Sequence, residues 1–123
     1  MSGVLEGLKV LDLSWGVAGP MTGMLLGDHG ANVTRIERPE GDPFEGLLGY
    51  KVWHRGKNNA VLNLKDASEL EIFYKLAADA DIVIESFRPG VTSRLKIDYP
   101  TLAATNPRLI YCSITGYGDD TED

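Results

Sequence analysis

Short apolar runs alternate with longer amphipathic segments along this chain of 123 residues. Each apolar run is brief and bounded by polar or glycine-rich residues, which is typical of strands buried in a sheet. The predicted strands are residues 9–13, 32–37, 59–64, 81–86 and 108–115. The predicted helices run from Pro20 to a closing Gly30, follow an N-cap at Asp66, and occupy residues 91–95 and 100–105. Because helices alternate with strands, we expect an α/β fold with a mostly parallel sheet and flanking helices.

The helix after the third strand has the clearest pattern. Asp66 and Glu69 form a predicted capping box, in which Asp66 is the N-cap and Glu69 reaches back to the amide of Asp66. Apolar residues then recur at spacings of three and four, which predicts one buried face. These residues are Leu70, Phe73, Tyr74 and Ala77.

A turn of mostly small residues joins the first strand to the first helix. It reads Ser-Trp-Gly-Val-Ala-Gly-Pro over residues 14–20, and the second strand ends near Arg35 and Arg38. In a parallel sheet, ligands collect outside the carboxyl ends of the strands, beside helix N-termini that favour anions. This unit therefore predicts a site for a small phosphate-bearing molecule. The turn lacks the G-x-G-x-x-G spacing, which argues against a standard NAD site.

The charge of the chain is unevenly distributed. The net charge is −6, but four negative charges lie in residues 119–123, so residues 1–118 carry only −2. A net negative charge disfavours nucleic acid and anionic membranes as partners. The sequence contains no run of 18 apolar residues, so no membrane span is predicted. We therefore expect a cytoplasmic protein. The cations gather locally, which suits a small polyanion, at Arg35, Arg38, His54, Arg55, Lys57, Arg88 and Arg94.

The sequence predicts neither a disulfide nor a metal site. Cys112 is the single cysteine, and its apolar surroundings in the sequence predict a buried structural thiol. His29 and His54 lie far from Cys112 and from each other, without the spacing of metal ligands. Residues 119–123 have no apolar anchor, so we expect a domain of residues 1–118 followed by an acidic frayed tail.

Four segments together resemble the N-terminal portion of the family III CoA-transferases. This family includes formyl-CoA and carnitinyl-CoA transferases and α-methylacyl-CoA racemase. The segments are residues 8–38, 59–65, 84–90 and 106–118. The resemblance implies a Rossmann-like sheet, coenzyme A or acyl-CoA as a substrate, a carboxylic acid as the second substrate, and no metal. It also implies an interlocked homodimer that includes the remainder of the polypeptide.

The resemblance further implies which residues contact CoA. A guanidinium such as that of Arg38 can donate paired hydrogen bonds to a phosphate, although a surface ion pair with Glu37 or Glu40 is the alternative. Ser86 replaces the asparagine of the family and offers fewer hydrogen bonds. Residues 55–57, Arg-Gly-Lys, are a secondary candidate because a basic loop is most often solvated. The implied CoA-binding residues are Val17, Ala18, Arg38, Leu62, Asn63, Leu64, Lys65, Ser86, Phe87, Arg88 and Arg94.

No catalytic residue is predicted within the chain. In the family, an aspartate attacks the acyl-CoA thioester and carries the acyl group as a mixed anhydride. None of Asp119, Asp120 and Asp123 matches that position, so we expect the catalytic aspartate beyond Asp123. The full-length protein is then expected to move CoA between an acyl-CoA thioester and a free carboxylic acid, and this portion alone to be inactive.

Three other functions stay open on the sequence alone. The racemase branch of the family would use the same CoA site and a His/Asp pair further along the chain. A non-catalytic CoA-binding module would end naturally near Asp123. A generic nucleotide-binding domain would bind nucleotides that lack pantetheine as well as it binds CoA.

Overall fold

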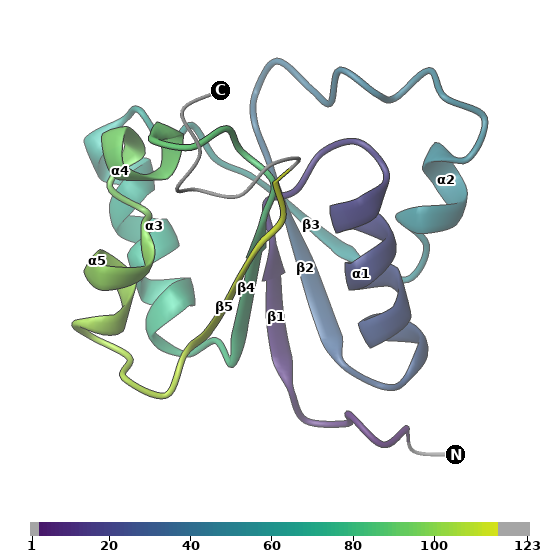
Figure 1. The fold of residues 1–123 in the computed structure, drawn as a ribbon, viewed down its shortest axis with the longest axis horizontal. Coiled ribbons are helices and arrows are strands. Elements are labelled where there is room, and N and C mark those ends of the chain that lie inside the picture. Colours follow the sequence, from purple (N-terminus) through teal and green to yellow (C-terminus); the bar gives the residue numbers. More distant parts are fainter. Residues whose placement is uncertain (1–2, 116–123) are drawn as a thin grey trace.

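A computed structural model describes residues 3–115 of the chain (Figure 1). The strands are β1 (Lys9–Asp12), β2 (Asn32–Glu37), β3 (Asn58–Val61), β4 (Ile82–Glu85) and β5 (Ile110–Ser113). The helices are α1 (Ala18–Asp28), α2 (Tyr50–Trp53), α3 (Ala67–Ala78), α4 (Val91–Leu95) and α5 (Tyr99–Ala103). The predicted acidic tail and the residues before it, 116–118, lie outside the described residues.

The five strands form one sheet in the order β3-β2-β1-β4-β5, and every neighbouring pair is parallel. Helix α1 covers one face of the sheet, and α3, α4 and α5 lie on the other (Figure 1). The predicted α/β class is therefore confirmed. The central strands β1 and β4 lie side by side, but the chain leaves them toward opposite faces. Such a reversal opens a crevice at the carboxyl ends of the two strands, where ligands of this kind of sheet bind.

The hydrophobic core lies on both faces of the sheet. Phe73 and Ala77 of α3 are buried, and Leu70 and Tyr74 pack against the same cluster, which confirms the predicted apolar face of this helix. On the opposite face a smaller cluster is formed by Val10, Val33 and Ile84, with Leu26 of α1 packed against it. Successive side chains of a strand alternate between faces, so the two layers draw on alternate residues of the same strands.

Several element boundaries differ from the sequence predictions. Helix α1 begins at Ala18, with Val17 as its N-cap, two residues before the predicted start at Pro20. A proline is tolerated there because the first-turn N–H groups of a helix have no intrahelical partner. The short helix α2, between β2 and β3, was not predicted. Strand β3 ends at Val61, so residues 62–65 leave the strand and line the end of the sheet.

Of the two predicted hydrogen-bonding roles in the capping box after β3, only that of Asp66 is present. The Asp66 side chain accepts hydrogen bonds from the N–H groups of Ser68 and Glu69, as an N-cap does. The Glu69 carboxylate instead accepts from the N–H of Asn63 at 3.2 Å, because the Asp66 N–H already donates to the Asn63 carbonyl. Cys112 is also less buried than predicted, since its side chain is half-buried beside the smaller core cluster.

Candidate functional site

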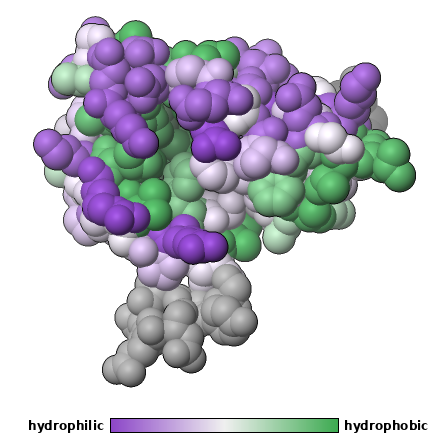
Figure 2. All heavy atoms as spheres, turned by 90° about the horizontal axis from the view of Figure 1, so that it is seen from above, coloured by the Kyte–Doolittle hydropathy of each residue, from purple (hydrophilic) through white to green (hydrophobic). Residues whose placement is uncertain are grey.

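A pocket of about 1020 Å³ opens at the carboxyl ends of β1, β2, β3 and β4. Figure 2, which looks onto this end of the sheet, shows a hollow of apolar residues bordered by hydrophilic side chains. The apolar lining includes Leu13, Ile36, Leu62, Leu64, Phe87, Val91 and Leu95. The cationic side chains that line it are Arg38, Lys65, Arg88 and Arg94. Apolar walls with a few placed cations suit a ligand that combines an apolar part with phosphate groups.

Most of the CoA-binding residues implied by the sequence come together at this pocket. Arg38, residues 62–65, residues 86–88 and Arg94 all line it. These residues follow the carboxyl ends of β2, β3 and β4, or lie on α4. Because the strands are parallel, their carboxyl ends meet at the same edge of the sheet. Val17 and Ala18 are not among the lining residues and lie exposed at the start of α1. That these residues contact CoA stays a prediction.

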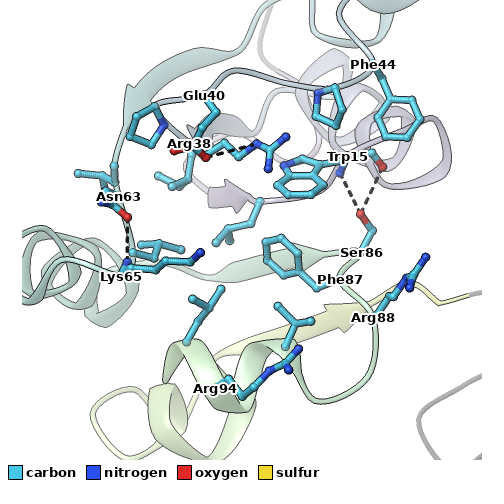
Figure 3. Close-up of a pocket in the computed structure, with 18 residues that line it drawn as sticks. Trp15, Arg38, Glu40, Phe44, Asn63, Lys65, Ser86, Phe87, Arg88 and Arg94 are labelled. Carbon is cyan, nitrogen blue, oxygen red and sulfur yellow. Dashed lines mark hydrogen bonds and ion pairs between the residues drawn. The ribbon is translucent and has the colours of Figure 1, made fainter.

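Arg38 lies against Trp15 at one wall of the pocket (Figure 3). Its guanidinium carbon is 4.3 Å from the centre of the Trp15 ring, and its Nε donates to the Gly41 carbonyl at 2.8 Å. The alternative ion pair with Glu40 is also present, at 3.8 Å between Nε and the carboxylate. Stacking and the Gly41 bond fix the plane of the guanidinium, and the side chain stays partly exposed to the pocket.

Ser86 and Phe87 hold the opposite side of Trp15. The Ser86 hydroxyl accepts a hydrogen bond from the backbone N–H of Trp15 at 2.9 Å and donates one to the backbone carbonyl of Trp15 at 3.2 Å. The Phe87 ring meets the Trp15 ring edge-on, with centroids 5.3 Å apart. A serine hydroxyl has one proton to donate, and here Trp15 receives it. The proton of the Ser86 hydroxyl is therefore used within the protein, and contact of Ser86 with CoA stays a prediction.

Lys65, Arg88 and Arg94 come to the pocket from different directions. Figure 3 shows the Lys65 side chain extending toward the space beside Phe87 from the β3 side, while Arg94 projects from α4. Arg88 and Arg94 both line the pocket from the loop and helix that follow β4. Several cations around one apolar hollow can neutralise a ligand that carries more than one phosphate.

Four of the seven cations that gather along the sequence do not line the pocket: Arg35, His54, Arg55 and Lys57. The Arg35 side chain is buried and pairs with Asp42 at 2.6 Å. Arg55 pairs with Asp28 on the surface at 2.6 Å. The Lys57 side chain is 1% exposed and pairs with Asp12 at 2.6 Å. The expectation of a solvated basic loop at residues 55–57 is therefore wrong for Lys57, because burial against a carboxylate is stable where every charge is paired.

His54 lies next to these buried charges and is not a pocket residue. Its side chain is 8% exposed, with Nδ1 at 3.3 Å from the Lys57 ammonium. Burial lowers its pKa to about 4, and the positive charges of Lys57 and Arg35 act in the same direction. Burial also lowers the pKa of Lys57, an effect that Asp12 opposes. His54 is therefore neutral near pH 7, and Nδ1 accepts from Lys57.

A smaller pocket of about 370 Å³ adjoins the first and shares Phe87 and Arg88 with it. Its wall includes the buried Glu85, whose carboxylate accepts from the Tyr111 hydroxyl at 3.2 Å and from the Ser113 hydroxyl at 3.3 Å. Burial, with Glu85 nearby, raises the pKa of Tyr111.

Within residues 3–115, no group of three or more His, Cys, Asp or Glu side chains could hold a metal ion. Over the same residues, no helix has the length and apolar character that crossing a membrane requires.

Sequence reasoning missed Trp15 as the wall of the site. Its signal was present, since a large aromatic residue stands three positions after the end of β1, in a turn of mostly small residues. The contact between Asp12 and Lys57 was also missed. These residues are 45 positions apart, and no local pattern links them.

Comparisons with known proteins agree with this fold. Residues 5–123 match CoA-transferase family III. The chain is 42% identical to a succinyl-CoA:mesaconate CoA-transferase of Haloarcula marismortui, over 95% of this chain and 33% of that protein. It is 40% identical to the human succinyl-CoA:glutarate CoA-transferase, over 93% of this chain and 28% of that protein. The chain thus spans about a third of the length of the curated relatives it matches.

Solved structures give the same result. A CAIB/BAIF family protein from Brucella suis superimposes with a TM-score of 0.90 at 36% identity, over 98% of this chain and 35% of that one. A hypothetical protein from Mycobacterium tuberculosis superimposes with a TM-score of 0.93 at 34% identity, over 98% of this chain and 36% of that one. On the family match and these structures together, the chain belongs to the family III CoA-transferases.

Proposed function

We propose that this chain supplies the CoA-binding region of an enzyme that moves CoA between an acyl-CoA thioester and a free carboxylic acid. The observation that carries the proposal is the large pocket at the carboxyl ends of the strands, with apolar walls and cations from separate elements. CoA has the matching composition, since it combines an adenine and a long pantetheine arm with a pyrophosphate and a 3′-phosphate. In the proposal, the cations bind the phosphates, and the apolar walls hold the base and the arm.

The position of the pocket supports this arrangement. It lies where the chain leaves β1 and β4 toward opposite faces, which is where parallel α/β sheets bind their ligands. Arg38 contributes a guanidinium whose plane is fixed by Trp15. A guanidinium held in one orientation loses little side-chain freedom when it binds a phosphate, so it favours binding.

The chemical step in this proposal uses an aspartate that matches no residue of this chain. Its carboxylate attacks the acyl-CoA thioester carbonyl, the C–S bond breaks, and CoA leaves as the thiolate while the acyl group forms an anhydride with the aspartate. The thiolate then attacks the aspartyl carbonyl of the anhydride, which releases the donor acid as a carboxylate and leaves an aspartyl-CoA thioester. The acceptor carboxylate attacks this thioester, so the thiolate leaves again and an anhydride of the acceptor forms. Attack of the thiolate on the acyl carbonyl of the acceptor yields the new thioester and restores the aspartate. The residues described here bind and orient CoA during that sequence.

A transferase is favoured over a racemase by the names of the relatives. The two named above are CoA-transferases that act on succinyl-CoA with mesaconate or glutarate, and a third, from Acetobacter aceti, is an acetyl-CoA:oxalate CoA-transferase at 42% identity. We propose the same reaction class here, with an acyl-CoA and a carboxylic acid as substrates.

Calorimetric titration of CoA into this chain tests the proposal. Arg38→Ala and Arg94→Ala should each raise the Kd at least tenfold, because each removes a charged hydrogen-bond donor from the pocket. Lys51→Ala removes an exposed positive charge on α2, outside the pocket, and should leave the Kd unchanged. Equal affinity of wild type and both arginine variants would contradict the proposed site. Binding of 3′,5′-ADP as tightly as CoA would favour a generic nucleotide site instead.

A further inference from the structure

We propose that Asp12 and Lys57 are positioning residues for CoA binding, because their buried ion pair holds both ends of the turn at residues 14–20 that carries the pocket residue Trp15. The inference rests on the CoA binding proposed above. Neither residue lines the pocket. Asp12 and Lys57 would affect CoA binding by setting the position of the turn.

The Lys57 ammonium is completely paired inside the protein. It donates to Asp12 Oδ2 at 2.6 Å and to the Pro20 carbonyl at 3.0 Å, and Nδ1 of His54 lies 3.3 Å away. An ammonium has three protons to donate, and these three acceptors account for them. The side chains of Lys57 and Asp12 are 1% and 0% exposed. Lys57 therefore cannot reach a bound phosphate and has a role inside the fold.

The pair connects to both ends of the turn. At the first end, Asp12 Oδ1 accepts from the Ser14 N–H at 2.9 Å and from the Ser14 hydroxyl. At the second end, Lys57 binds the Pro20 carbonyl in the first turn of α1. The carboxylate and the ammonium are themselves paired, so one ion pair fixes the separation between the two ends of the turn.

Close packing leaves this unit little room to move. A Cβ atom added at Gly23 would lie 2.7 Å from Asp12 Oδ2 and 3.1 Å from the Lys57 ammonium. A Cβ added at Gly19 would lie 2.3 Å from the Ser14 Cβ. Helix α1 can approach the ion pair this closely only because residue 23 is a glycine, and it can approach Ser14 only because residue 19 is one.

The turn at residues 14–20 positions Trp15, which forms one wall of the pocket. Trp15 follows Ser14 directly, its backbone is held by the Ser86 hydroxyl, and its ring supports the Arg38 guanidinium. A change in the separation of the turn's ends would displace Trp15, and with it the plane of Arg38. The expected consequence of breaking the pair is weaker CoA binding without loss of any group that touches CoA.

The test compares CoA affinity and its salt dependence in Lys57→Met and two reference variants. Lys57→Met should raise the Kd at least tenfold while the slope of log Kd against log salt stays that of the wild type, because every cation that lines the pocket keeps its charge. Arg94→Ala should raise the Kd and lower this slope. Arg55→Met is the matched control, since it breaks an exposed ion pair between Arg55, two residues before Lys57, and Asp28 at the C-terminal end of α1. It should leave both the Kd and the salt slope unchanged.

A double variant keeps the test valid if Lys57→Met does not fold. Asp12→Asn with Lys57→Met removes both charges together, which is tolerated better than one unpaired buried charge. It should be folded and still bind CoA at least tenfold more weakly, because the link to Pro20 is gone. In a Trp53→Phe background, where Trp15 is the single tryptophan, both variants should shift the emission maximum of the folded protein.

The outcomes separate this inference from the proposed function. Wild-type affinity and unchanged Trp15 emission in the folded double variant would overturn the positioning role, even where Arg94→Ala still weakens binding. A lowered salt slope in Lys57→Met would also overturn it, since that result indicates a direct phosphate contact. A wild-type chain that binds no CoA would overturn the proposed function, and this inference with it.

Discussion

The buried position of His54 predicts a specific pH dependence of stability. The pKa of this histidine is lowered to about 4 in the folded chain, chiefly by burial and next by the charge of Lys57. In the unfolded chain the pKa returns to the ordinary value of 6.5. Between pH 6.5 and 4 the unfolded state therefore binds more protons, so the free energy of unfolding falls as the pH falls through this window.

The size of the effect follows from the two pKa values. At pH 5.5 about nine tenths of the unfolded His54 is protonated while the folded His54 is neutral, which stabilises the unfolded state by about RT ln 11, or about 1.4 kcal/mol. At pH 7.5 the contribution is close to zero. The lower pH stays above the isoelectric point of about 4.8, so the chain keeps a net negative charge at both values.

Urea unfolding of the wild type and His54→Asn at pH 7.5 and 5.5 measures this contribution. Asparagine does not titrate, and all other ionisable groups, including His29, are common to both chains. Between pH 7.5 and pH 5.5, the unfolding free energy of the wild type should fall by about 1.4 kcal/mol more than that of the variant. A difference that does not change with pH would refute the buried, neutral state of His54.

Three further predictions follow from packing and from the pocket. Phe73→Ala should lower the free energy of unfolding by about 3–5 kcal/mol in urea, since the ring is fully buried, and a loss below about 1 kcal/mol would contradict that burial. Gly19→Ala should cost about 1–3 kcal/mol in the same assay, because its Cβ would lie 2.3 Å from the Ser14 Cβ; unchanged stability would refute this close approach. Arg38→Lys should raise the calorimetric Kd for CoA about tenfold, because it keeps the charge and loses the fork of donors stacked on Trp15, whereas an unchanged Kd would mean that charge alone suffices.

The parts of the fold that depend on local pattern were predictable from the sequence. The bounds of β2 and α4 match the predicted ranges of 32–37 and 91–95. The gathering of residues 62–65 and 86–88 at one pocket was also predictable, because parallel strands bring their carboxyl ends to one edge of the sheet.

The buried ion pairs were not predictable in the same way. Lys57 belongs to a basic segment of the kind that is usually solvated, and its partner Asp12 lies within the predicted apolar strand 9–13. Whether a lysine is exposed or buried depends on which carboxylate the fold brings to it, and that is decided by packing between distant segments. Arg35 is similar, since its pairing with Asp42 requires the loop after β2 to fold back.

The central claim is that CoA binds at the carboxyl ends of the strands, between Arg38 and Arg94. The most direct test is an NMR titration of the isotope-labelled chain with CoA, following backbone amide shifts. The account predicts the largest saturable shifts at residues 62–65 and 86–88 and at Trp15, with small shifts at Ile72 on the exposed side of α3. Saturable shifts confined to residues that do not line the pocket, or none in a folded chain at millimolar CoA, would contradict it.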